Sequence, residues 1–132
     1  MPEMRVTSVS HILYRVWDVE AAFGFFVDVL GFAPQRRGNI TYARLGDVLI
    51  EFARTDAPAE PPTQYIFGLR VEDLDQVLSE LQSKGVEIVR PVFEGTSFWG
   101  RQVVVAVPGA PPLALREWRA PDGPSFEGWT PA

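Results

Sequence analysis

The chain of 132 residues contains no cysteine and a single histidine. The absence of cysteine excludes disulfides, thiolate metal ligands and cysteine nucleophiles. One histidine without cysteine argues against a hydrolase triad, and the sequence contains neither a GxSxG elbow nor a glycine-rich phosphate loop of the Walker or Rossmann type. Ser10 adjoins His11, but strand alternation is expected to direct the two side chains to opposite faces. Carboxylates, arginines, aromatic side chains and His11 are left to carry any chemistry.

Long hydrophobic runs and an excess of positive charge are also missing. The most apolar run, Val103 to Leu115, is interrupted by prolines, and the first residues, MPEMRVTSVS, lack a basic leader followed by an apolar stretch. The formal net charge of -5 argues against nucleic acid or an anionic membrane as a partner and favours neutral or cationic ligands. The short basic pairs Arg36-Arg37 and Arg116 with Arg119 are interpreted as solvated charges. We expect a cytoplasmic protein.

The sequence does contain an internal repeat. Residues 11–31 and 66–85 each combine an apolar strand, an aspartate (Asp18 or Asp73) able to cap a helix, an amphipathic helical pattern, and a glycine that ends it. The copies differ most at their first position, where His11 in one copy corresponds to Ile66 in the other.

Periodicity predicts an α+β fold in which the order strand, helix, three strands occurs twice. The two helices follow the capping aspartates and end before Gly31 and Gly85. Strands are expected at 8–17, 41–45, 48–53, 65–72, 86–93, 102–107 and 113–118, with a less regular strand at 32–37. We expect one domain over 1–132, with a first module at about 7–54, a proline-rich linker at 55–63, a second module at about 64–118 and a tail at 119–132.

These features together resemble the vicinal oxygen chelate superfamily, which includes glyoxalase I, extradiol dioxygenases and the bleomycin and fosfomycin resistance proteins. The resemblance is carried by the doubled module, by His11 in the first strand, by DVLGF at the end of the first helix and by LIEF at the end of the first module. It covers about residues 7–118. The resemblance implies a curved, cup-like, mostly antiparallel sheet with helices on its outer face and a ligand cavity within the cup.

The resemblance also implies where a metal would be held. Metalloenzymes of the superfamily take one ligand from the first strand and one from the last strand of each module, which corresponds here to His11, Glu51, Ile66 and Ala114. Neither Ile66 nor Ala114 offers a donor atom, so a first-row metal bound by the other two residues and water should be held weakly. His11 is then a metal ligand or a lone histidine facing the cavity. Glu51 either recognises a ligand or pairs with an inward arginine, Arg15 or Arg70.

Strand alternation predicts which other side chains share the inward face with His11 and Glu51. They are Val9, Leu13, Arg15, Leu49, Ala53, Gly68 and Arg70, while Ile12, Tyr14, Val16, Ile50 and Phe52 should pack beneath the helices. Gly68 and Ala114 would leave space for a ligand, unless the protein's own side chains close the cup.

The segment 93–101, FEGTSFWGR, is too aromatic for an ordinary polar loop. Phe98 and Trp99 could close over a flat or cationic ligand by stacking, in the manner of the tryptophan-bearing loop of the bleomycin resistance proteins. The alternative is that Trp99 covers the core or a subunit contact. In the tail, Phe126 and Trp129 either dock on the protein or are incidental.

Two functions follow. The preferred hypothesis is a metal-independent protein of the bleomycin-resistance type, a homodimer that needs no cofactor and binds a small organic molecule such as an antibiotic. Its ligand-binding residues would be His11, Leu13, Glu51, Ile66, Gly68, Arg70, Phe98, Trp99 and Ala114. The alternative is a glyoxalase- or dioxygenase-like enzyme in which His11 and Glu51 hold Zn, Ni, Mn or Fe as a Lewis acid. A fold retained only for assembly or regulation is a third hypothesis.

Overall fold

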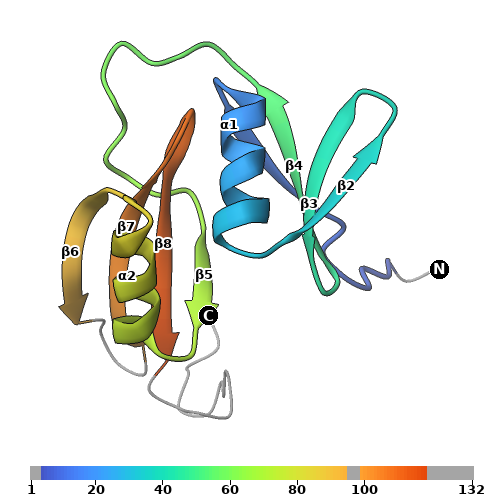
Figure 1. Ribbon diagram of the computed structural model, residues 1–132. Helices are drawn as coiled ribbons and strands as arrows, with labels where there is room; N and C mark the ends of the chain where they lie inside the picture. The colour runs from blue at the N-terminus through green and yellow to red at the C-terminus, as the bar shows by residue number, and fades with distance from the viewer. Residues whose placement is uncertain (1–3, 95–98, 119–132) are drawn as a thin grey trace. The chain divides into compact units, whose positions relative to one another are not determined.

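The computed structural model describes residues 4–94 and 99–118. Its elements are β1 (Ile12–Val16), α1 (Val19–Gly24), the π-helix η1 (Phe25–Val29), β2 (Ala33–Arg37), β3 (Ile40–Leu45), β4 (Val48–Arg54), β5 (Gly68–Val71), α2 (Leu74–Ser83), β6 (Ile88–Glu94), β7 (Trp99–Val107) and β8 (Ala110–Trp118) (Figure 1). The α+β class and the repeated order of one strand, one helical segment and three strands are confirmed. The chain divides into two compact units, Met1–Ala59 with Pro108–Ala110, and Glu60–Val107 with Pro111–Ala132.

The first unit contains a four-stranded mixed sheet in the order β1-β4-β3-β2. Strand β1 runs parallel to β4, with Ile12 opposite Ile50 and Val16 opposite Arg54. The other pairs are antiparallel, and β3 turns into β4 through Gly46, whose φ of 57° suits the tight turn expected from the Gly-Asp dipeptide. The expected strand at 32–37 is present as β2.

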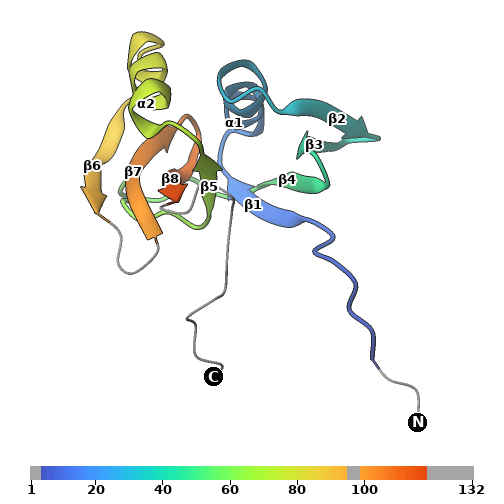
Figure 2. The ribbon, with the colours of Figure 1, turned by 90° about the horizontal axis from the view of Figure 1, so that it is seen from below.

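Helix α1 lies against one face of this sheet (Figure 2). Aromatic side chains form the core between them. Tyr14, Ile50 and Phe52 are buried, as alternation predicts, and so is Val16, while Ile12 is half-buried. The Phe26 ring makes edge contacts with the rings of Tyr14 and Phe52 and also with the buried Phe32. The opposite face of this sheet is not covered by a helix of the unit. We call it the open face.

The first helix differs from the regular helix predicted over residues 19–30. It is α-helical only as far as Gly24 and continues as the π-helix η1, in which the Leu30 N–H donates to the Phe25 carbonyl five residues earlier. A wider turn allows the consecutive residues Phe25 and Phe26 both to be buried, at 6% and 0% exposure, whereas an α-helical turn separates neighbours by about 100°. The predicted helix is therefore correct in position and wrong in type at its end.

The second unit contains a four-stranded sheet in the order β5-β8-β7-β6, with α2 on one face (Figures 1 and 2). Strand β5 runs parallel to β8, and its pairing begins with Gly68 opposite Ala114. The prolines at 111 and 112 thus occupy the part of β8 that β5 does not pair, where a missing N–H matters least. Strands β6 and β7 are antiparallel, with register shifts at Ile88/Arg90 and Arg90/Phe93.

Both helices begin as predicted. Asp18 accepts a hydrogen bond from the Ala21 N–H at the start of α1, and Asp73 accepts one from the Gln76 N–H at the start of α2. Gly31 and Gly85 have φ of 81° and 79°, so the glycines expected after the helices adopt the left-handed conformation that favours this residue. No helix within 4–94 and 99–118 is long and apolar enough to cross a bilayer.

Several strand ends differ from the predictions, most of all the starts of β1, β5, β7 and β8, and β8 begins at Ala110 rather than at 113. Strand β1 begins at Ile12 rather than at 8, and β5 begins at Gly68 rather than at 65, because the residues before each strand have no ladder partner in the register. Strand β7 begins at Trp99, so most of the segment predicted as a loop at 93–101 is strand. Only 95–98 connects β6 to β7, and these residues lie outside the described part of the chain.

Candidate functional site

The open face of the first sheet carries a row of side chains that runs across all four strands. In the register, Leu13 lies opposite Glu51, Glu51 opposite Tyr42, and Tyr42 opposite Gln35. Leu13 is 40% exposed and Glu51 and Tyr42 are half-buried, whereas the alternate residues of these strands lie in the core. The predicted positions of Leu13 and Glu51 on one face are confirmed, and Tyr42 joins them.

The Glu51 carboxylate has no hydrogen-bond or ion-pair partner among the side chains of the described first unit. The ion pair of that unit joins Arg36 to Glu20 with a distance of 3.0 Å between Nη2 and Oε2. No ion pair joins Glu51 to Arg15, one of the two arginines considered as its partner, although both residues lie on the open face. A half-buried carboxylate beside Leu13 and the Tyr42 ring can accept hydrogen bonds from a ligand that has an apolar body and a polar or cationic group.

His11 lies directly before β1 and is exposed. Its Nδ1 is 3.0 Å from the Ser10 hydroxyl oxygen, so the prediction that the two side chains point to opposite faces is wrong. The reason is that alternation holds only within a strand, and both residues precede β1. The contact orients the imidazole.

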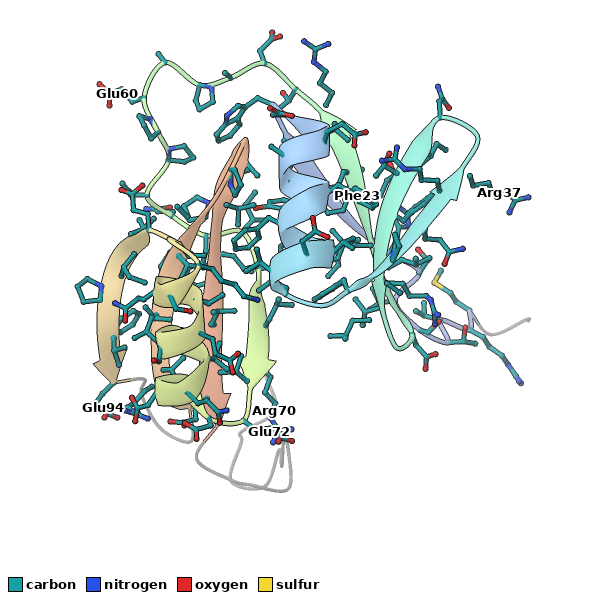
Figure 3. All side chains as sticks on the ribbon, in the orientation of Figure 1. Phe23, Arg37, Glu60, Arg70, Glu72 and Glu94 are labelled. Atoms are coloured by element: carbon teal, nitrogen blue, oxygen red, sulfur yellow. The ribbon has the colours of Figure 1, made fainter. Side chains whose placement is uncertain are left out.

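The face of the second sheet that lies away from α2 carries the candidates from the second module. Gly68 pairs with Ala114, and a Cβ added at Gly68 would lie 3.4 Å from the Ala114 Cβ, so these residues leave room for no more than one methyl group between them. Ala114 is 1% exposed and Ile66 is 58% exposed. Arg70 lies further along β5 and is exposed (Figure 3).

Arg116 is not the solvated charge that its place in a short basic pair predicts. It is half-buried, its Nε and Nη2 both donate to the side-chain oxygen of Gln102, and Nη2 also donates to the Tyr65 hydroxyl at 3.3 Å. Gln102 is itself only 5% exposed. Alternation within β8 places Arg116 on the face of Ala114, but it does not identify Gln102 or Tyr65 as partners, because that requires the register of β7.

The residues present do not match a four-ligand metal site of the kind that the resemblance implies. Two of the four positions, Ile66 and Ala114, carry hydrocarbon side chains. Within 4–94 and 99–118, no three histidine, aspartate or glutamate residues approach closely enough to hold an ion together. Phe98 lies outside the described residues, and so does the side chain of Trp99, so the predicted aromatic lid stays a prediction.

Residues 8–123 match the family model of the Glyoxalase/Bleomycin resistance protein/Dioxygenase superfamily. The chain belongs to this superfamily. No match was found among proteins with curated descriptions.

Solved structures share the fold. TnmS3, an antibiotic binding protein from Streptomyces sp. CB03234, is 24% identical, with a TM-score of 0.67 over 88% of this chain and 99% of that one. The fosfomycin resistance protein FosX from Mesorhizobium loti is 16% identical, with a TM-score of 0.65 over 86% and 93%. Lactoylglutathione lyase from Agrobacterium tumefaciens is 12% identical, with a TM-score of 0.66 over 86% and 96%. The superfamily therefore includes binding proteins and enzymes, and membership alone does not assign catalysis.

Proposed function

We propose that this superfamily member is a metal-independent binding protein for a small organic molecule, such as an antibiotic, and acts as a cytoplasmic homodimer. The observation that carries the proposal is the loss of donor atoms at Ile66 and Ala114, two of the four positions where the resemblance places metal ligands. A site left with one imidazole and one carboxylate has little affinity for a first-row ion. The likeness to TnmS3, an antibiotic binding protein, supports the proposal at the level of fold.

In this function, His11, Glu51 and Arg70 provide polar recognition of the ligand. Leu13, Ile66, Gly68 and Ala114 provide an apolar or close-fitting surface, and Phe98 and Trp99 provide stacking. The half-buried Glu51 is the strongest of these candidates, because its carboxylate has no hydrogen-bond or ion-pair partner within the described part of the first unit.

The first test is metal content. Protein purified without a His-tag should contain less than a stoichiometric amount of any transition metal by elemental analysis, and divalent ions should bind weakly in a titration. Stoichiometric metal that disappears in His11→Ala would overturn the proposal. The matched control is Glu87→Ala, which removes an exposed side chain from the second unit and should not change metal content.

The second test concerns the ligand. Bleomycin-type compounds should quench the tryptophan fluorescence of the metal-free protein, and Glu51→Gln should weaken the response by about tenfold, because a hydrogen bond to a charged group is worth about 1.5–3 kcal/mol. The absence of quenching would remove the drug-binding version of the proposal.

A second candidate function is supported by the two donor residues that the first module retains. His11 and Glu51 would hold a divalent ion in a glyoxalase- or dioxygenase-like enzyme. The ion would supply Lewis-acid polarisation of vicinal oxygens on a substrate. The metal measurement above separates this candidate from the preferred one.

A further inference from the structure

A second row of side chains crosses the open face of the first sheet, two residues along the strands from the row that contains Glu51. Arg15 lies opposite Ala53 in the register of β1 with β4, and Arg37 lies opposite Ile40 in the register of β2 with β3. One further step of the pairing between β3 and β4 places Ile40 beside Ala53. We call these four side chains the arginine row. Their order across the sheet is Arg15, Ala53, Ile40 and Arg37.

Alternation and burial show that the arginine row points away from α1. Three of its members have strand neighbours in the core, namely Tyr14, Phe52 and Thr41, which are no more than 5% exposed. The neighbour of the fourth is Arg36, which stacks on the Phe23 ring of α1 with 4.7 Å between the guanidinium carbon and the ring centroid. Because successive residues of a strand point to opposite faces, the whole row lies on the open face.

The arginine row is cationic at both ends and apolar in the middle. Arg15 and Arg37 are exposed, on the two outer strands of the sheet (Figure 3). Within the described part of the chain, neither side chain donates a hydrogen bond or forms an ion pair. Ile40 is 42% exposed and Ala53 is half-buried. A ligand that lies along this row therefore meets an arginine at each end and hydrocarbon between them.

The open face differs in charge from the chain as a whole. Its charged side chains in strands β1 to β4 are Arg15, Arg37, Arg44 and Glu51, which gives three positive charges against one negative charge. The net charge of the chain is -5, and on that basis a neutral or cationic ligand was expected. Local charge determines what one face attracts, so this face favours an anion. Glu51 lies about 7 Å along β4 from Ala53, outside the arginine row.

We propose that the arginine row binds a medium-chain α,ω-dicarboxylate, a linear molecule with a carboxylate at each end and an apolar middle. Three strand spacings separate Arg15 from Arg37, which puts their Cα atoms about 14 Å apart. The two carboxylate carbons of extended sebacate, a ten-carbon dicarboxylate, are about 11 Å apart. Each guanidinium can therefore bind one carboxylate while the methylene chain lies over Ala53 and Ile40. The inference goes beyond the proposed function and does not depend on it, since none of these four residues belongs to the ligand-binding set given there.

The experiment titrates the ¹⁵N-labelled full chain with sebacate at low ionic strength in the presence of EDTA, and follows backbone amide and arginine Nε resonances. We expect saturable shifts centred on the amides of Ile40 and Ala53 and on the side chains of Arg15 and Arg37. Monomethyl sebacate keeps the chain length and loses one charge, whereas succinate keeps both charges and loses the length. Each should bind at least about threefold more weakly than sebacate.

Substitutions test each end of the arginine row. Arg15→Gln and Arg37→Gln should each weaken sebacate binding by about threefold to fivefold, as expected for loss of an exposed ion pair at low salt. The matched control is Arg44→Gln, which removes the same charge from the same face about 13 Å along β3 from Ile40. It should change binding by less than about 1.5-fold. All three arginines are exposed, and the amide spectrum reports the fold of each variant.

Three outcomes would overturn the proposal. Equal affinities for sebacate and monomethyl sebacate would show that the two ends do not act together. A loss in Arg44→Gln as large as the loss in Arg15→Gln would show that only the overall charge of the face matters. Succinate binding as tight as sebacate binding would exclude a medium-chain ligand.

Glu51→Gln separates this site from the site of the proposed function. The substitution should weaken the fluorescence response to bleomycin-type compounds but should not weaken sebacate binding, because removal of a nearby negative charge favours an anion. Weaker sebacate binding in Glu51→Gln would overturn a separate dicarboxylate site. Because EDTA is present throughout, the titration also gives its answer independently of the metal content that tests the proposed function.

Discussion

At the scale of single residues, Tyr14 has the most perturbed environment in the first unit. It is 0% exposed, lies against the rings of Phe26 and Phe52, and its burial raises the pKa of the phenol well above the ordinary value of 10.0. The folded state therefore keeps the Tyr14 proton at a pH where the unfolded chain has released it.

This difference predicts how stability changes with alkaline pH. From about pH 10 up to the raised pKa, only the unfolded state loses the Tyr14 proton, so the free energy of unfolding should fall by about 1.4 kcal/mol per pH unit. Urea unfolding between pH 8 and 11 measures this slope. Tyr14→Phe should remove it and Tyr42→Phe should retain it. An equal slope in the wild type and in Tyr14→Phe would contradict the prediction.

Gly109 is a second residue whose identity is dictated by its surroundings. Within the first unit its carbonyl accepts hydrogen bonds from the N–H groups of Trp17 and Asp18, at 2.7 and 3.0 Å. Its φ is 71°, and an added Cβ would lie 2.4 Å from the Asp18 Cβ. The turn therefore requires both a left-handed backbone and the absence of a side chain.

Gly109→Ala should consequently lower the free energy of unfolding by about 3 kcal/mol, the sum of left-handed strain and a steric clash. Gly38→Ala is the matched control, because Gly38 has a similar φ of 61° with no atom within 4 Å of the added Cβ. It should lose only about 1 kcal/mol. Equal losses in urea unfolding would show that the contact with Asp18 is not tight.

Alternation within strands is enough to predict that Leu13 and Glu51 share one face of the first sheet and that Tyr14 and Phe52 share the other. It does not predict the contact of Ser10 with His11, because these residues precede the strand. It also does not predict that Gln102 holds Arg116, because side-chain contacts between strands depend on a register that hydrophobic pattern alone leaves open.

At the scale of elements, one arginine joins α2, β7 and β8. The Arg101 guanidinium donates to Asp75 on the helix and to Glu117 on β8, and these two carboxylates raise its pKa further above the ordinary value, Asp75 contributing most. Glu117 also accepts a hydrogen bond from the Leu74 N–H at the first turn of α2. The Glu117 carboxylate thus binds both Arg101 on the neighbouring strand β7 and the N-terminus of α2.

Loss of the Glu117 carboxylate and loss of the Asp75 carboxylate should lower the free energy of unfolding by different amounts. Glu117→Ala should lower the free energy of unfolding by about 1–3 kcal/mol, because it leaves the Leu74 N–H without an acceptor and removes one of the two carboxylates that bind Arg101, in a site where the Glu117 side chain is 24% exposed. Asp75→Ala should cost less than about 1 kcal/mol, since the Asp75 side chain is 73% exposed. Urea unfolding of both variants measures the difference. A larger loss in Asp75→Ala would contradict the assignment.

Element order is predictable from periodicity and caps, but element type is not always so. The apolar spacing behind Asp18 predicts a regular helix, whereas the chain forms a π-helix from Phe25 because two consecutive phenylalanines enter the core. Strand ends also escape prediction, since a strand stops where its partner stops. Gly68, for example, pairs with Ala114. Neither copy of the repeat contains both residues, so the pattern of the repeat cannot predict where this pairing begins.

At the scale of the whole molecule, a connection without regular secondary structure runs from 55 to 67 between β4 and β5. Most of its residues are exposed, which fits the linker expected from its prolines. Within the described part of the chain, subtilisin should cut first in 55–67 or in the exposed residues 4–11, as peptide masses would show. First cuts inside β4 or β8 would contradict this.

The strict alternation of the first sheet has a consequence for folding fidelity. Sliding β1 by one residue against β4 would turn Arg15 toward the aromatic core and Tyr14 toward water, and the same slip of β4 would bury Glu51. Burying an unpaired charge is far more expensive than losing one ladder bond. The charged side chains on the open face therefore destabilise every sheet with a shifted register, and they do so whether or not a ligand ever binds there.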